Sequence, residues 1–173
     1  MPTFEIDTSH SEIGFTVRHM VFAKVRGQFK TWSADLAWNP ADPSKSTVAV
    51  AIDTASIDTR EEKRDGHLRS GDFFDAEKFP KMTFKSKRVE GKGPFKLVGD
   101  LTIRDVTKEV VVDVEQTGTG KDPWGNTRFG FSGRASIDRT EFGLKWNAAL
   151  ETGGFIVSDK VDIDVEVQIV QKG

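Results

Sequence analysis

The chain has 173 residues, with 25 Lys and Arg against 27 Asp and Glu, and it contains no cysteine. The balanced and interspersed charge argues against a nucleic-acid footprint or a polybasic membrane patch, and the lack of cysteine excludes disulfides, thiolate metal ligands and cysteine nucleophiles. We expect one domain, residues 1–173, with a sizeable core.

The N-terminal segment lacks the basic and apolar regions of a secretory signal, and no stretch approaches the roughly 18 apolar residues that a membrane-spanning helix needs. We therefore expect a soluble protein without an integral membrane segment. Its expected location is the cytoplasm, or the periplasm if the chain is the trimmed mature form of an exported precursor.

Apolar and polar residues alternate along most of the chain, which indicates half-buried strands. In the first strand, Ile13, Phe15, Val17 and His19 share one face. Seven further strands are expected, bounded mostly by turn residues rich in Gly, Pro, Asn and Asp. They lie at residues 24–38, 48–52, 82–84, 97–103, 108–118, 129–137 and 161–170.

Eight antiparallel strands without alternating helices predict an all-β sandwich or a closed up-and-down barrel. Long strands and inward-phase glycines at Gly27, Gly99 and Gly133 favour the barrel, because a tightly curved sheet needs that room. The interior of an eight-stranded barrel is either filled by side chains or holds one small ligand. Composition alone leaves both possibilities open.

The segment Arg60–Pro80 interrupts the strand pattern. Thr59 and Glu62 form a capping-box pattern, which predicts a helix over residues 60–69 that ends near Gly71. The helix is too polar to be a core element. With Leu68, Phe73 and Phe74, this connection either caps a barrel mouth or plugs the other end or covers an open edge.

Enzyme and metal sites find little support in the sequence. Asp7, His10 and Ser11 lie within five consecutive positions, which rarely converge as a catalytic triad and instead predict a hydrogen-bonded turn. The TGTGK segment lacks the first glycine and the following Ser or Thr of a phosphate loop, and the three histidines have no short metal-ligand spacing. We predict no catalytic residue, no metal and no cofactor.

His19 lies on the inward phase at the end of an apolar row. It is either a core histidine bonded to a buried carbonyl or a residue near a mouth that holds the polar head of a lipid. In the second case, Arg60, Arg64 or His67 of the interrupting segment would be its companions.

Five segments, in this order, closely resemble the YceI-like family: IDTSHSEIGFTVRHM, VRGQF, REEKRDGHLRSGDFFDAEKFPKMTFKS, GDLTIRDVTKEVVVDV and GGFIVSDKVDIDVEVQI. The motif positions carried over are Asp7, His10, Ser11, His19, Arg60, Asp65, His67, Leu68, Phe73, Phe74 and Phe79. The resemblance implies an eight-stranded antiparallel lipocalin-like barrel with a short helical insertion between strands 3 and 4. It also implies a tunnel that binds a polyisoprenoid or another long amphiphilic lipid, and it carries no catalytic residue set.

The predicted function is therefore binding, carriage or sequestration of a long-chain polyisoprenoid or fatty-acid-like lipid. The predicted ligand-binding residues are Phe15, Val17, His19, Phe29, Leu68, Phe73, Phe74, Phe84, Leu97, Phe129, Phe131, Phe142 and Trp146. One alternative is an enzyme acting on a lipid in the same barrel, with His19 or Asp7 as acid or base. Another is a filled, ligand-free stress protein. Edge pairing or an outer apolar patch would allow a homodimer, and no nucleic-acid partner is expected.

Overall fold

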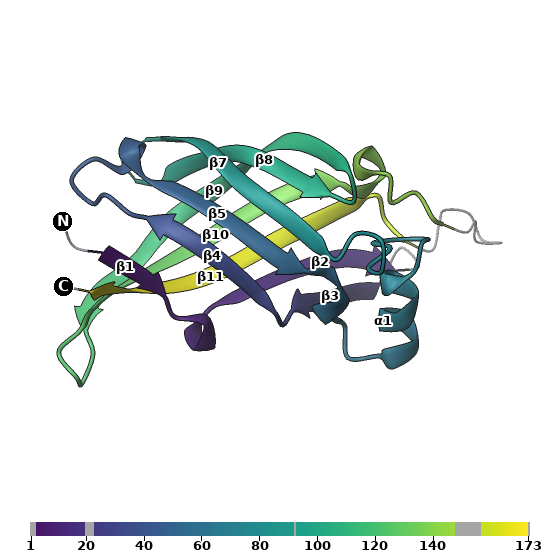
Figure 1. The fold of residues 1–173 in the computed structure, drawn as a ribbon, viewed down its shortest axis with the longest axis horizontal. Helices are drawn as coiled ribbons and strands as arrows, with labels where there is room; N and C mark the ends of the chain where they lie inside the picture. The colour runs from purple at the N-terminus through teal and green to yellow at the C-terminus, as the bar shows by residue number, and fades with distance from the viewer. Residues whose placement is uncertain (1–2, 20–22, 92, 148–156, 173) are drawn as a thin grey trace.

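A computed structural model describes residues 3–19, 23–91, 93–147 and 157–172, with only the backbone described for His19. In these residues, eleven strands form one antiparallel sheet, accompanied by a single α-helix (Figure 1). The strands are β1 (Thr3–Ile6), β2 (Glu12–His19), β3 (Ala23–Phe29), β4 (Trp32–Ala37), β5 (Thr47–Asp53), β6 (Ile57–Asp58), β7 (Lys81–Glu90), β8 (Phe95–Ile103), β9 (Val106–Lys121), β10 (Thr127–Asp138) and β11 (Lys160–Lys172). Their order is β4-β5-β7-β8-β9-β10-β11-β2-β3-β6, with β1 paired to β11.

The predicted count of eight strands is corrected to eleven. The segment expected as one strand over residues 24–38 bends between β3 and β4, and its halves pair with β2 and β5 respectively. β1 and β2 pair with successive parts of β11 and are separated by a 3₁₀ turn at Thr8–His10. The chain therefore bends once between β3 and β4 and once between β1 and β2.

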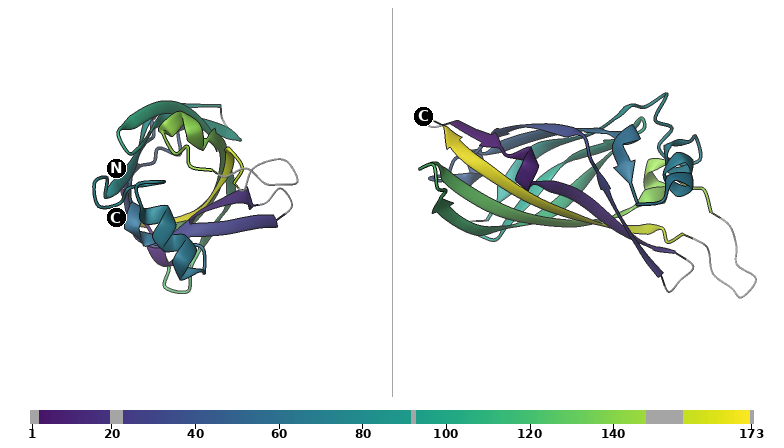
Figure 2. Two further views of the ribbon diagram at one scale, coloured as in Figure 1. Left: turned by 90° about the vertical axis from the view of Figure 1, so that its right-hand side faces the viewer. Right: turned by 90° about the horizontal axis from the view of Figure 1, so that it is seen from below.

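The sheet rolls around a central axis into an antiparallel barrel (Figure 2). The barrel is open along one line, because β4 and β6 stand at the two ends of the hydrogen-bonded path. β1 lies beside the outer edge of β4, although these two strands are not paired in the described sheet.

The helix α1 (Glu62–Arg69) lies at one end of the barrel, together with the 3₁₀ helix η4 (Arg139–Phe142), whereas β1 and the β9–β10 turn lie at the other (Figures 1 and 2). α1 begins later than predicted because Arg60 has a left-handed backbone, with φ 66°. Glu61 caps α1 by accepting a hydrogen bond from the Arg64 amide. The predicted capping box is wrong, since Thr59 donates both its amide and its hydroxyl to Asp65.

The buried apolar core is concentrated at the α1 end. It joins strand residues to the loop after α1 and to η4, and its members are Phe29, Ile52, Ile57, Phe73, Met82, Leu101, Ile103, Phe142 and Leu144. This packing anchors a polar helix that has little apolar surface of its own. None of the described helices is long and apolar enough to cross a lipid bilayer.

Candidate functional site

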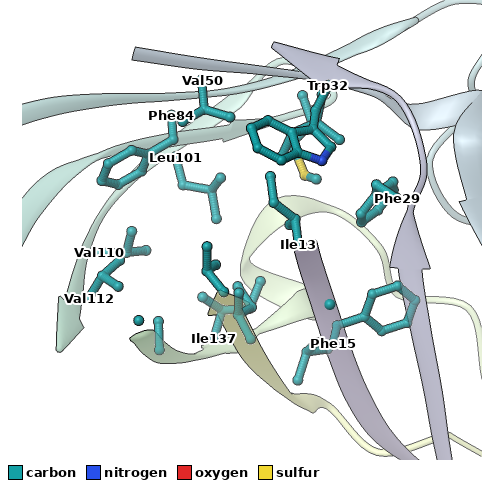
Figure 3. Close-up of a pocket in the computed structure, with 18 of the residues that line it drawn as sticks. Ile13, Phe15, Phe29, Trp32, Val50, Phe84, Leu101, Val110, Val112 and Ile137 are labelled. Carbon is teal, nitrogen blue, oxygen red and sulfur yellow. The ribbon is translucent and has the colours of Figure 1, made fainter. Parts of the chain in front are cut away.

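A cavity of about 650 Å³ lies inside the barrel and extends from α1 towards the opposite end. Figure 3 shows Phe15, Phe29 and Trp32 on one side of it and Phe84, Val110 and Val112 on the other. Its volume is within the range of about 300–1,000 Å³ typical of small-molecule sites. The interior that composition left undecided is therefore a cavity and not a solid core.

The cavity wall follows directly from strand periodicity. In β11, Val161, Ile163 and Val165 line the cavity, whereas the intervening Asp162 and Asp164 are exposed. Successive side chains of a strand point to opposite faces of the sheet. The lining is consequently almost entirely apolar, and among the described residues it contains no Asp or Glu.

Two glycines leave room for aromatic rings to lie against the wall. Gly27 is the cross-strand partner of Phe15, and a Cβ atom at Gly27 would come within 2.3 Å of Phe15 Cζ. A Cβ atom at Gly99 would come within 2.5 Å of Phe84 Cζ. Since both rings occupy the space above a glycine, they contribute apolar surface without filling the centre of the barrel.

We call the α1 end of the cavity the mouth. Most of the polar lining residues lie there, namely Thr59, Lys63, Arg64, His67 and Arg139, whereas Ser46 and Thr47 line the cavity at the start of β5. His67 Nε2 lies 2.8 Å from Asp72 Oδ2. The imidazole meets the Trp146 ring edge-on at a centroid distance of 4.6 Å and the Phe73 ring at 5.2 Å. α1 is thus attached to the mouth by an aromatic cluster.

Arg139 stabilises the other side of the mouth. It is 4% exposed, and its guanidinium donates to the carbonyls of Leu144 at 2.6 Å, Trp146 at 3.0 Å and Ser158 at 2.9 Å. Burial lowers the pKa of Arg139 from its ordinary value. These bonds connect the segment that follows η4 to the segment that leads into β11.

The far end of the cavity is aromatic. The Trp38 ring meets Phe131 at 5.1 Å and Phe95 at 5.9 Å, both nearly perpendicular. Trp38 Nε1 is buried and has no hydrogen-bond partner among the described residues. Beyond this cluster, Phe4 of β1 packs edge-on against Phe129 at 5.6 Å, which closes the barrel at this end.

Asp7, Ser9 and His10 form a turn outside the cavity. Asp7 accepts hydrogen bonds from the Ser9 hydroxyl at 2.6 Å and from Arg128 at 2.7 Å, and these bonds hold its pKa well below the ordinary range. Ser9 Oγ and Asp7 Oδ2 both approach the same His10 nitrogen, Nδ1. A Ser-His-Asp relay needs the two opposite ring nitrogens, so the arrangement is a structural turn, as predicted.

Most of the predicted ligand-binding residues line the cavity: Phe15, Val17, Phe29, Leu68, Phe73, Phe74, Phe84, Leu97, Phe131 and Trp146. Phe129 is corrected, because Phe4 covers it at the closed end and it is absent from the lining. Phe142 is also corrected: η4 interrupts the strand alternation and places it in the packed core, 1% exposed. The side chain of His19 lies outside the described residues.

The predictions omitted several lining residues. Trp32 lines the cavity because the apolar phase shifts by one residue at the bend between β3 and β4, and Lys63 lines it because α1 lies at this end of the barrel. Nothing in the sequence around Arg139 distinguishes it from an arginine on the surface. No group of three or more His, Asp or Glu residues that could hold a metal ion occurs in the described parts of the chain.

The family model described as the YceI-like domain matches residues 4–169. The chain belongs to the YceI-like family. It is 37% identical to a UPF0312 protein of Vibrio cholerae over 173 residues, covering 98% of this chain and 87% of that protein. A UPF0312 protein of Shewanella sp. is 38% identical with the same coverage.

Solved structures of the YceI-like fold superimpose over nearly the whole chain. The YCEI protein of Campylobacter jejuni has a TM-score of 0.78 at 33% identity and full coverage of both chains. BcnA of Burkholderia cenocepacia has a TM-score of 0.82 at 26% identity, covering 95% of this chain and 99% of its own. A polyisoprenoid binding domain from Saccharophagus degradans has a TM-score of 0.72 at 13% identity, which shows the shared fold.

The positions carried over from the YceI-like family serve different parts of this structure. Asp7 and Ser11 build the turn between β1 and β2, where the Ser11 hydroxyl donates to the Asp7 carbonyl at 2.7 Å. Asp65 is buried and holds Thr59 ahead of α1. His67 and Phe73 lie at the mouth. The family pattern therefore combines residues that shape the barrel with residues that face its cavity.

Proposed function

We propose that this chain is a lipocalin-like protein that binds, carries or sequesters a long-chain amphiphile, either a polyisoprenoid or a fatty-acid-like lipid. The observation that carries the proposal is the cavity itself, which is apolar along the barrel and polar only near its ends. An apolar pocket with a few polar groups is the usual form of a site for such molecules.

The energetics of burial support this proposal. Each buried methylene group contributes about 0.8 kcal/mol, so a tail of about twenty carbons gains on the order of 16 kcal/mol before the cost of association. That cost is roughly 4–15 kcal/mol, which still leaves net binding without any covalent or metal bond. Selection among tails of similar length would then be weak.

The polar mouth supports an orientation in which the tail points towards Trp38 and the head remains near α1. Arg64 and His67, two of the predicted companions for the head, line the cavity, whereas Arg60 does not. The structural likeness to a polyisoprenoid binding domain agrees with a tail bound in the barrel. The contribution of His19 stays a prediction, as do the homodimer and the location in the cell.

Binding accounts for the site better than catalysis does. Asp7, one of the two acid-base candidates, lies in the turn before β2 and does not line the cavity. Membership of the YceI-like family and the polyisoprenoid-binding neighbour also favour a binding protein. The function proposed here therefore involves no reaction and no cofactor.

A titration with uncharged long-chain alcohols of increasing length tests the proposal. Affinity should rise by about fourfold per methylene, as 0.8 kcal/mol implies, until the tail fills the cavity, and then level off. The change in the fluorescence emission of the tryptophans that line the cavity provides the signal. Failure of every chain length to bind, or an affinity independent of length, would contradict the proposal.

A further inference from the structure

The ionisable residues that line the cavity are all basic. Lys63, Arg64, His67 and Arg139 line it at the mouth, and none of the described lining residues is acidic. The formal net charge of the whole chain is only −2, with both signs interspersed. The mouth is therefore a local concentration of basic groups in a nearly neutral protein.

Lys63 and Arg64 carry charges that no carboxylate neutralises directly. Neither side chain forms a hydrogen bond or an ion pair with an Asp or Glu side chain among the described residues; the Arg64 backbone amide alone donates to the Glu61 carboxylate. Arg64 donates to the Thr59 hydroxyl at 2.7 Å and to the Thr59 carbonyl at 2.6 Å, and it reaches Asp65 only through that hydroxyl. The amine of Lys63 remains available beside the cavity.

The other two basic residues are already occupied. His67 shares a 2.8 Å contact with Asp72. Arg139 donates to backbone carbonyls and has Asp159 at 3.8 Å. These partners hold both residues in place, so they maintain the shape of the mouth. Arg64 donates to Thr59 through Nε and Nη2 only, which leaves its Nη1, with the Lys63 amine, without a partner among the described residues and able to bind a ligand.

We propose that Lys63 and Arg64 form a subsite for an anionic head group, a carboxylate or a phosphate ester, on the amphiphile whose tail occupies the barrel. This inference rests on the proposed function. A head of this kind would accept charge-assisted hydrogen bonds, which are roughly twice as strong as neutral ones. The subsite lies beside an apolar cavity, where the effective dielectric constant is lower than in water and the attraction is less screened.

The test compares three ligands with the same C20 prenyl tail and different heads: an alcohol, a carboxylic acid and a monophosphate. Isothermal titration at neutral pH and low salt measures each affinity. We expect the acid and the phosphate to bind about tenfold more tightly than the alcohol, equivalent to about 1.4 kcal/mol. Inorganic phosphate at the same concentrations should not displace the alcohol, because a tail is needed to occupy the cavity.

The double variant Lys63→Gln/Arg64→Gln removes both charges. It should bind the acid and the phosphate no more tightly than the alcohol. The readout is the ratio of its affinities for the anions and for the alcohol, and a cooperative urea denaturation transition shows that the variant is folded. Lys108→Gln is the matched control, because Lys108 is an exposed residue of β9 outside the cavity lining and should leave all three affinities unchanged.

The outcomes separate this inference from the function on which it rests. Equal affinities of the wild type for all three ligands, or a preference for anions that persists in the double variant, would overturn the anionic subsite and leave the lipid-binding function intact. If none of the three ligands binds to the wild type, the proposed function itself fails.

Discussion

Gly99 shows how a single residue keeps the cavity open. A Cβ atom at this position would lie 2.5 Å from Phe84 Cζ and 2.6 Å from the Lys85 carbonyl oxygen. The second contact is with backbone and cannot be relieved by rotating a side chain. We therefore expect Gly99→Ala to lower the free energy of unfolding by about 1–3 kcal/mol, measured by urea denaturation.

Gly118→Ala is the control for this prediction. Gly118 is also in a strand, but a Cβ atom there would meet nothing within 4 Å. The substitution should change stability by no more than about 0.5 kcal/mol. If the two alanine variants are equally stable, the close packing of Phe84 over Gly99 does not require a glycine at this position.

At the residue scale, the sequence predicted the direction of most side chains but not the depth at which each lies. Phe129 and Phe131 have the same phase, yet Phe131 lines the cavity and Phe129 lies under Phe4. Alternation determines which face of the sheet a residue occupies. The point at which the cavity ends is set by β1, which places Phe4 over Phe129. The alternation of residues within β10 does not reveal this contact.

At the scale of the elements, Arg128 connects the β9–β10 turn to the turn after β1. Its guanidinium binds Asp122 at 2.8 Å and Asp7 at 2.7 Å. The bond from Arg128 is the main cause that lowers the pKa of Asp122 to about 2, and the pKa of Asp7 is also lowered. Both carboxylates are therefore charged in the folded protein at pH values where they begin to be protonated in the unfolded chain.

This network predicts a specific loss of stability in acid. A carboxylate with a lowered folded pKa stabilises the fold fully above its unfolded pKa of 3.8, and the contribution is lost as the pH falls through the folded pKa of about 2. The free energy of unfolding should therefore decrease between these pH values. Arg128→Gln should flatten the decrease, as measured by denaturation at a series of pH values.

Arg134→Gln provides the comparison for Arg128. Arg134 is also in β10, and it pairs with Asp164 at 3.5 Å on an exposed surface. Exposed pairs contribute little, so this variant should retain the wild-type dependence on pH. Identical acid profiles for Arg128→Gln and wild type would show that the network does not control acid stability.

Arg139 supports the elements of the mouth, and its removal should be costly. Arg139→Gln would leave several buried carbonyls of the segments around η4 and β11 without a donor. We expect a loss of about 2–4 kcal/mol in the free energy of unfolding, with a smaller loss for Arg139→Lys, whose single amine cannot reach both segments. A Gln variant as stable as the wild type would contradict this role.

At the same scale, the positions of the strands were largely predictable, whereas bends and caps were not. The apolar phase over residues 24–38 slips by one position at Lys30 and Thr31, from Val25 and Phe29 to Trp32 and Ala34. The slip does not show that β3 and β4 pair with different strands. The start of α1 was misplaced because Thr59 and Glu62 match a capping box by spacing alone. In the structure, the Thr59 hydroxyl donates a hydrogen bond to Asp65 and does not cap the helix.

For the whole molecule, lipid binding requires that the cavity be empty space available to a tail. Ile163→Trp adds a large ring on the lining face of β11, so it should reduce affinity for a long-chain alcohol at least tenfold, or about 1.4 kcal/mol. Asp164→Trp places the same ring on the exposed face of the next position and should leave affinity unchanged. Equal affinities for the two variants would locate binding outside the barrel.

The all-β antiparallel architecture and the YceI-like relationship were both accessible from the sequence, because they depend on alternation and on five motifs in order. The cavity was not derivable from composition, since the same phenylalanines and glycines could have packed into a solid core. It depends on rings such as Phe15 lying over Gly27, a cross-strand arrangement that only the register reveals.

The most direct test of the account is to purify the protein without detergent, measure its intact mass under native conditions, and identify by mass spectrometry what organic solvent extracts from it. The protein should carry about one long-chain amphiphile per chain, or take up one stoichiometrically when it is offered to empty protein. A protein that is empty and takes up neither isoprenoid nor fatty amphiphiles would contradict it.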